Sequence, residues 1–400
     1  MGRCYISDCA VYRVRWGPRT TLLLIELSVS DGVAGLGEAS MSGDDAMAAH
    51  YVGELFEQVL RGRPATEVPK LIEALSSRAG AASVFCEATA ASALEQALWD
   101  IQGQLLNVPI HTLLGGGLEN SVPLYANINR MPGERTCAMF AQHASGAREA
   151  GFHAVKCAPF DEVLPAEVDD GSEGLGKGLD RVAAVRAAVG GDCALMVDCH
   201  GRLGERRARE VMPPLRALSV KWLEEPILTS KEVLRVIRYR SPEADEHAAI
   251  GLAGLRSLAR DRTIPLAGGE MVVGLSRFID LLQLRVLDFI MPDVKYCGGI
   301  LTASRVGAIA GVYGARVTPH NPSGPVATLG AAHVAVVSAT LDSLEVAWGE
   351  LIPDRGLVDP PLRIEAGALV LPEGPGLGAR LVPDTLQRLS IPLDADFSYL

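Results

Sequence analysis

The sequence predicts an α/β protein: a (β/α)8 barrel together with a smaller α+β domain built from the two ends of the chain. Three observations predict this fold. Strand-like and helix-like segments alternate between residues 121 and 355, which is typical of parallel strands joined by right-handed crossovers. Acidic and histidine side chains recur where those strands end, and in a barrel the strand ends share the face that carries the active site. Both ends of the chain follow a different pattern.

The N-terminal segment, residues 1–120, predicts a mixed α+β unit. Residues 4–40 predict a meander of strands, in which two β-rich stretches fill residues 4–32 and the glycine-rich stretch 32–40 that follows is rich in turn residues. Residues 44–105 predict helices, because apolar side chains recur there near the helical period. The glycines at 115–117 then break the pattern, so we place the domain boundary near residue 120.

The second segment, residues 121–355, contains the barrel. The predicted strands are 121–129, 153–158, 194–200, 220–225, 264–270, 287–293, 315–320 and 344–350. These eight units in about 235 residues match the usual barrel size of roughly 250. An open, doubly wound sheet is the alternative fold. However, no GxGxxG motif opens a helix here, and open sheets gather ligands at one switch point.

The C-terminal segment, residues 356–400, predicts short strands and turns, since prolines interrupt it. We expect it to fold back onto the N-terminal unit and complete a capping domain.

Composition excludes several classes of function. The net charge is −11 and no basic stripe is present, which argues against a nucleic-acid partner. The eight cysteines are scattered without a CxxC pair, so we expect reduced thiols in a cytoplasmic protein. The first residues lack the apolar core of a signal peptide, and the apolar runs are too short to span a bilayer. We therefore expect no membrane partner.

Three carboxylates end three successive predicted strands: Asp198, Glu224 and Glu270. Carboxylates that meet at one face repel each other unless a divalent cation lies among them. Ligands that are all oxygen suit a hard ion, so we predict one Mg²⁺ per site. A single strand-end acid could instead cap a helix or pair with a lysine, but three on neighbouring strands favour the metal.

Two histidines follow strands in the same way. His320 and Asp293 end adjacent predicted strands, and a carboxylate bonded to one ring nitrogen makes the other nitrogen a better base. His200 follows Asp198 by two residues, so the two side chains project from the same side of an extended chain. His200 could act as a general acid on the opposite face of a substrate. The alternative is a loop histidine bonded to backbone.

Lys156 and Glu345 are candidates for holding a substrate carboxylate. Lys156 ends the second predicted strand, and Glu345 lies on the eighth. A structural salt bridge is the alternative for each of them.

Taken in this order, the residues resemble the enolase superfamily and, within it, the mandelate racemase subgroup. Segments 93–116, 292–300 and 375–381 also resemble its domain-joining helix, its sixth-strand end and its C-terminal stretch. The resemblance implies a capping domain over a modified (β/α)8 TIM barrel. It also implies roles for the candidate residues: Mg²⁺ ligands Asp198, Glu224 and Glu270, base dyad Asp293 and His320, and Glu345 against the substrate carboxylate. The chemistry it implies is proton removal by a Lys or His base, with Mg²⁺ stabilising the resulting enediolate.

Two departures narrow the expected reaction. The family often has Lys-x-Lys at the second strand end, whereas here Ala158 replaces the second lysine, which disfavours racemisation by two bases. The run VDCHGR at 197–202 resembles the D-x-H-G-R of galactonate-type acid-sugar dehydratases, where the histidine protonates the leaving hydroxyl. The second departure is length. Glu224 and Glu270 are 46 residues apart, whereas family members often have far fewer residues between these positions, and 241–261 resembles an insertion.

We therefore predict a Mg²⁺-dependent dehydratase that converts an aldonate to a 2-keto-3-deoxy acid. One alternative is an epimerase or racemase that uses His200 and His320 as opposing bases. Another is a non-catalytic homologue that binds acid sugars. We expect specificity to come from loop 38–45 with Asn127 and Asn129, and we expect a homo-oligomer, from dimer to octamer.

Overall fold

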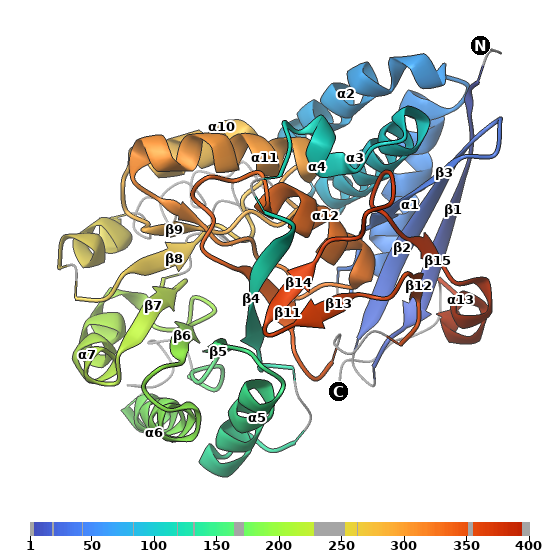
Figure 1. The fold of residues 1–400 in the computed structure, drawn as a ribbon. Coiled ribbons are helices and arrows are strands. Elements are labelled where there is room, and N and C mark those ends of the chain that lie inside the picture. The colour runs from blue at the N-terminus through green and yellow to red at the C-terminus, as the bar shows by residue number, and fades with distance from the viewer. Residues whose placement is uncertain are drawn as a thin grey trace.

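The computed structural model of the chain describes most of its residues (Figure 1). The described ranges are 4–17, 20–41, 43–82, 84–117, 119–130, 133–163, 172–227, 253–261, 263–350 and 355–393. Within these ranges, no helix is both long enough and apolar enough to cross a bilayer. All of the cysteines carry free thiols, and most of them are buried.

Eight parallel strands form the barrel, and each lies inside one of the eight predicted segments. They are β4 (Ser121–Asn127), β5 (Ala154–Cys157), β6 (Ala194–Asp198), β7 (Val220–Glu224), β8 (Leu266–Gly268), β9 (Phe289–Ile290), β10 (Arg316–Val317) and β11 (Leu344–Ala347). Strands β4 to β10 pair in chain order, and β11 pairs in parallel with β4. The sheet closes because Val317 of β10 bridges Leu341, just before β11. The predicted barrel is confirmed.

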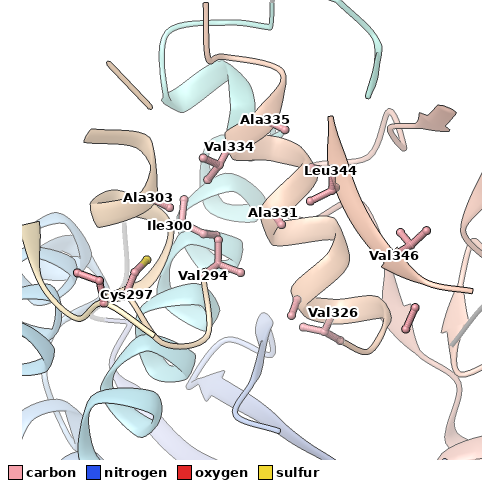
Figure 2. Close-up of a cluster of buried hydrophobic side chains, with 14 of the residues drawn as sticks. Val294, Cys297, Ile300, Ala303, Val326, Ala331, Val334, Ala335, Leu344 and Val346 are labelled. Atoms are coloured by element: carbon pink, nitrogen blue, oxygen red, sulfur yellow. The ribbon is translucent and has the colours of Figure 1, made fainter. Parts of the chain in front are cut away.

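Helices follow the strands and cover the outside of the barrel (Figure 1). They are α5 (Cys137–Glu149), α6 (Ser172–Val189), α7 (Gly204–Ala217), α10 (Leu275–Gln283), α11 (Gly299–Ala310) and α12 (Pro325–Ala335). Residues 253–261 form a further helix, whereas the rest of the predicted insertion, 241–252, lies outside the described residues. Figure 2 shows Ile300 of α11 on one side of α12 and Leu344 of β11 on the other, and both belong with Val326 of α12 to the buried apolar core.

A separate apolar layer fills the interior of the barrel and supports the strand ends. It consists of Tyr125, Met196, Trp222, Ala267, Phe289 and Met291. Side chains two residues apart on a strand project to the same face. Met196 therefore lies below Asp198, and Trp222 lies below Glu224. The indole Nε1 of Trp222 donates to Oε2 of Glu224 at 3.2 Å, which shows how this layer helps to orient the polar groups above it.

The N-terminal unit is an antiparallel sheet covered by helices. Its strands are β1 (Ile6–Arg15), β2 (Thr21–Val29) and β3 (Ala34–Glu38), and its helices are α1 (Asp45–Leu55), α2 (Val68–Ala81) and α3 (Phe85–Leu106). It also contains a π-helical turn (Phe56–Leu60), a 3-10 turn (Ala65–Glu67) and α4 (Ile110–Leu113). The glycine-rich stretch 32–40, which the sequence predicts as turn-rich, contains strand β3, the last strand of the predicted meander. Its glycines let the strand lie directly against α3.

The C-terminal segment contacts both units. It contains β12 (Val358–Asp359), β13 (Arg363–Glu365), β14 (Ala368–Val370), β15 (Arg380–Leu381), α13 (Pro383–Leu389) and β16 (Ser390–Ile391). Strand β16 pairs with β1 of the N-terminal sheet, while β14 pairs with β4 of the barrel. The segment therefore joins the N-terminal sheet to the barrel; the residues at which the domains divide stay predictions.

Two buried carboxylates of the N-terminal unit tie it to the barrel. Glu95 on α3 accepts from two backbone amides at the start of α11, both at 2.8 Å. Glu38 accepts from two amides at the start of α12, at 2.7 and 3.0 Å. A helix N-terminus carries unpaired amides and partial positive charge, so it favours a carboxylate. These contacts fix the loops that follow Asp293 and His320.

Candidate active site

Three carboxylates occupy neighbouring strand ends at the mouth of the barrel. Asp198 ends β6 and lies in register with Glu224, which ends β7. Glu270 comes two residues after β8. Gly269, between them, has a φ of 97°, a left-handed conformation that glycine adopts without strain. Asp198 and Glu224 are buried, so their charges need partners.

Lys156 supplies the cation that these buried carboxylates share. Its Nζ lies 2.5 Å from Oε1 of Glu224, 3.0 Å from Oε1 of Glu345 and 3.7 Å from Oδ2 of Asp198. Burial opposes the charge on Lys156, but Glu224 and Glu345 outweigh it and hold its pKa well above the ordinary value. Burial, together with the charges of the other carboxylates, raises the pKa of Glu224 despite Lys156.

Glu345 lies at the centre of a second set of contacts on β11. Its Oε1 accepts from Nδ2 of Asn127 at 2.6 Å, and its Oε2 accepts from the backbone amide of Asn321 at 3.1 Å. Burial raises the pKa of Glu345, but the positive charges of Lys156 and His320, together with hydrogen bonds from Lys156 and Asn321, outweigh that effect and hold the pKa below its ordinary value. Glu345 is therefore a buried anion whose oxygens are already engaged.

His320 and Asp293 form a hydrogen-bonded pair. Nδ1 of His320 lies 2.8 Å from Oδ2 of Asp293, and its Nε2 lies 3.3 Å from Oε2 of Glu270. A carboxylate accepts, so Nδ1 donates to Asp293 and Nε2 is the nitrogen presented at the strand ends. Burial lowers the pKa of His320, but Glu270 and Asp293 outweigh burial and raise it to about 9.

His200 is held between two other carboxylates. Nε2 lies 3.0 Å from Oδ2 of Asp198, and Nδ1 lies 2.6 Å from Oδ1 of Asp161. The charge of Asp198 is the largest cause that raises the pKa of His200 well above its ordinary value. Burial opposes the charge on Asp198, but His200 and Lys156 outweigh it and lower the pKa of that carboxyl.

The side chains predicted to give specificity already contact other groups of the protein. Glu38 and Asp45, at the two ends of loop 38–45, are fully buried, and Asp45 accepts from the hydroxyl of Thr21. Asn127 donates to Glu345, while the Oδ1 of Asn129 accepts from a backbone amide at the end of β5. Their role in specificity stays a prediction.

Sequence reasoning missed three residues that contact the site: Asp161, Asn321 and Lys295. The Nζ of Lys295 lies 3.7 Å from Oδ2 of Asp293, two residues away in the chain. His200 was found because it follows Asp198 by two residues, and Lys295 follows Asp293 by the same spacing. That spacing could have indicated Lys295 as a site residue. Asp161 and Asn321 lie in loops, where no periodic pattern reports the direction of a side chain.

Comparison with known proteins identifies the family. Residues 139–385 match the model of the enolase C-terminal domain-like family. Residues 16–115 match the N-terminal domain of mandelate racemase and muconate lactonizing enzyme. The chain belongs to the enolase superfamily, in its mandelate racemase subgroup. The resemblance that the sequence motifs indicate is thereby confirmed.

Curated relatives within this superfamily are sugar-acid dehydratases by name. The D-galactonate dehydratase of Verminephrobacter eiseniae is 30% identical over 389 residues, which cover 94% of this chain and 92% of the relative. The D-gluconate dehydratase of Thermoproteus tenax is 31% identical over 307 residues, which cover 76% of this chain but only 56% of the relative. The chain thus spans about half the length of the second relative.

Solved structures of the superfamily share the fold. A mandelate racemase/muconate lactonizing enzyme from a Jannaschia species superposes with a TM-score of 0.80 at 24% identity, covering 97% of this chain and 98% of that one. An enolase superfamily member from Salmonella Typhimurium superposes with a TM-score of 0.82 at 22% identity, covering 96% of this chain and 98% of that one. At these identities the likeness concerns the fold alone.

The donor set of this chain fits the Mg²⁺ that members of the enolase superfamily generally use. Asp198, Glu224 and Glu270 offer only carboxylate oxygens, which a hard divalent ion prefers. In the described residues, no three acidic, histidine or cysteine side chains converge closely enough to hold a metal as they stand. In this arrangement Lys156 binds Glu224 and His200 binds Asp198. The carboxylate oxygens therefore suit Mg²⁺, but cationic side chains occupy them here.

Proposed function

We propose that the protein is a Mg²⁺-dependent dehydratase of an aldonate, with Asp198, Glu224 and Glu270 as the metal ligands. The observation that carries the proposal is the pair of histidines. His320 is bonded to Asp293 through Nδ1 and His200 to Asp161 through Nδ1, so each presents Nε2 next to a strand-end carboxylate. The dehydratase names of its relatives support the same reaction class.

The reaction removes the proton at C2 and the hydroxyl at C3. A bound Mg²⁺ would supply positive charge beside the substrate carboxylate, where a second negative charge develops. His320, oriented by Asp293, takes the C2 proton through Nε2 in its neutral form, which a cation bound to Glu270 would favour by offsetting the charge that raises the pKa of His320. His200 gives a proton to the departing 3-hydroxyl, and the enol product tautomerises to a 2-keto-3-deoxy acid.

Lys156 and Glu345 complete the proposed substrate site. Both are buried and already bonded to each other, so the substrate would meet a fixed ion pair. The ammonium of Lys156 would attract the substrate carboxylate, and Glu345, itself an anion, would hold that ammonium in place, since fixed partners need no reorganisation.

A screen of aldonates with Mg²⁺ tests the function. We expect one or a few of them to yield a 2-keto-3-deoxy acid, and a chelator to abolish the yield until Mg²⁺ is restored. Failure of every aldonate to form keto acid would overturn the proposal. A change in optical rotation without keto acid would instead identify an epimerase.

Two variants then separate the histidines. In deuterated solvent, His200→Asn should lose dehydration while the enzyme still exchanges the C2 proton, because His320 is intact. His320→Asn should lose both, since the first step needs the base; the loss should be on the order of 10²–10⁴-fold. Turnover of His200→Asn near the wild-type rate would exclude His200 as the proton donor.

A further inference from the structure

Asp161 contacts His200 on the ring nitrogen that lies away from Asp198. Its Oδ1 lies 2.6 Å from Nδ1 of His200, while Nε2 of the same ring lies 3.0 Å from Oδ2 of Asp198. An ionised carboxylate only accepts hydrogen bonds, so Nδ1 carries a proton. The contact with Asp161 fixes the ring. The side chain is still 39% exposed, so a substrate can reach it.

The backbone of His200 is also held in one conformation. His200 has a φ of 44°, in the left-handed region that a residue with a Cβ rarely adopts. Its amide donates to Oδ1 of Asp198 at 2.9 Å, and the flanking amides of Cys199 and Gly201 donate to carbonyls at the end of β7, at 2.9 and 2.7 Å. Strain of this kind is kept where the surrounding structure requires one geometry, often at functional sites.

Asp161 is itself held from the opposite side. Nη1 of Arg135 lies 3.4 Å from Oδ2 of Asp161, the oxygen that His200 does not use. Arg135 also donates to the carbonyl of Ala158 and to Glu162, and its guanidinium lies over the ring of Phe140 at 5.2 Å. A cation with these fixed contacts keeps the carboxylate of Asp161 in place.

We propose that Asp161 is the positioning residue for His200, an inference that rests on the dehydratase function proposed above. In that reaction the C2 proton goes to His320, and the electrons of the C2–H bond form the C2–C3 double bond. The C3–O bond breaks with its electron pair on oxygen, and a proton from His200 lets that oxygen leave as water. Asp161 touches no reacting atom. It binds Nδ1, so Nε2 is the nitrogen that meets the leaving group.

A substrate that needs no proton donor provides the test. A 3-deoxy-3-fluoro aldonate, the analogue of the aldonate found by the screen, loses fluoride as a stable anion. Asp161→Ala should lower kcat for the hydroxyl substrate by about tenfold to hundredfold with KM nearly unchanged. It should lower kcat for the fluoro analogue by no more than about threefold, because that elimination does not need His200. Equal losses on both substrates, or no loss on either, would overturn the proposal.

Two further variants control for structure. Asp161→Asn keeps an oxygen acceptor for Nδ1 and should retain more activity than Asp161→Ala. Glu162→Gln is the matched control, since Glu162 is the next residue and bonds the same Arg135. It should leave both substrates unaffected. A loss in Glu162→Gln as large as in Asp161→Ala would assign the effect to the loop rather than to His200.

A spectroscopic readout distinguishes failure of this inference from failure of the proposed function. With ¹⁵N-histidine, and with His200 assigned from His200→Asn, the proton on Nδ1 should be visible in the wild-type protein and in Glu162→Gln but lost in Asp161→Ala. Persistence of that signal in Asp161→Ala would overturn the positioning role whatever the activity. An inactive wild-type protein would overturn only the proposed function.

Discussion

The Nζ of Lys156 lies 2.5 Å from Oε1 of Glu224, inside the barrel and out of contact with solvent. The same ammonium lies within 3.7 Å of Asp198 and 3.0 Å of Glu345. One buried cation thus serves three buried carboxylates. Removing one partner of such a group leaves uncompensated charge in a medium of low polarity, which costs more than the pair itself contributes.

Lys156→Met should therefore destabilise the metal-free protein strongly. We expect the free energy of unfolding to fall by about 3–5 kcal/mol, the usual cost of breaking a buried ion pair. Added Mg²⁺ should recover more stability in this variant than in the wild-type protein, because a ligand that binds only the folded state stabilises it. Thermal unfolding of both proteins with and without Mg²⁺ measures the two effects.

Lys221→Met is the matched control. Lys221 lies 2.5 Å from Oδ2 of Asp342, a distance equal to that of the Lys156 pair, but its side chain is 32% exposed. Solvent screens the ammonium of Lys221, and Asp342 keeps a second cation, Arg316, whose Nη1 lies 3.2 Å from its Oδ1. We expect a much smaller loss of stability and no added response to Mg²⁺. An equal loss in the two variants would show that burial of the Lys156 group carries no special cost.

The barrel and the identity of its strand-end residues could be predicted from the sequence because both signals are local. An acidic residue that ends an apolar segment is visible without any knowledge of the fold, and strand order fixes which ends are neighbours. The contacts between side chains could not be predicted in this way. Asp161 meets His200 across 39 residues of chain, and Glu95 meets the start of α11 across 205. Such pairs exist only once loops and helices have packed.

The close packing of strand β3 on α3 also could not be predicted from local sequence signals. The stretch 32–40 is rich in glycine, which by local rules predicts turns. In the structure β3 lies against α3, and a Cβ on Gly35 or Gly37 would overlap the carbonyl oxygen of Ala97 or Ala93. Glycine is needed there for close approach of strand and helix, which is a property of the packed fold.

Gly37→Ala should therefore destabilise the N-terminal unit. Its new methyl group would collide with backbone of α3, which cannot move aside as a flexible side chain can. Overpacking of this kind costs about 1–3 kcal/mol. Gly53→Ala is the control, because Gly53 lies on α1 with open space around it. That change should stabilise the helix by up to about 1 kcal/mol. Denaturant unfolding of the two variants should therefore shift in opposite directions, and a stabilised Gly37→Ala would contradict the packing argument.

His333 joins α12 to α4 and to the C-terminal segment. Its Nε2 lies 3.3 Å from the carbonyl oxygen of Leu377, and its Nδ1 lies 3.0 Å from Nδ1 of His111. A carbonyl only accepts, so Nε2 carries the proton, and the Nδ1 of a neutral His333 must accept from His111. Burial disfavours a second proton and lowers the pKa of His333 to about 3.

Acid should therefore destabilise the protein through His333. In the unfolded chain a histidine takes up a proton below about pH 6.5, whereas the folded His333 does not until about pH 3. Unfolding then binds a proton, and stability falls as the pH falls through that window, by about 1.4 kcal/mol per pH unit. Between pH 6.5 and 5, urea unfolding of His333→Gln should show a loss smaller than that of the wild-type protein by about 2 kcal/mol. His50→Gln, a change at a side chain that is 65% exposed, should keep the wild-type slope. If the stability of His333→Gln also kept the wild-type dependence on pH, the buried neutral imidazole would not be the group that titrates.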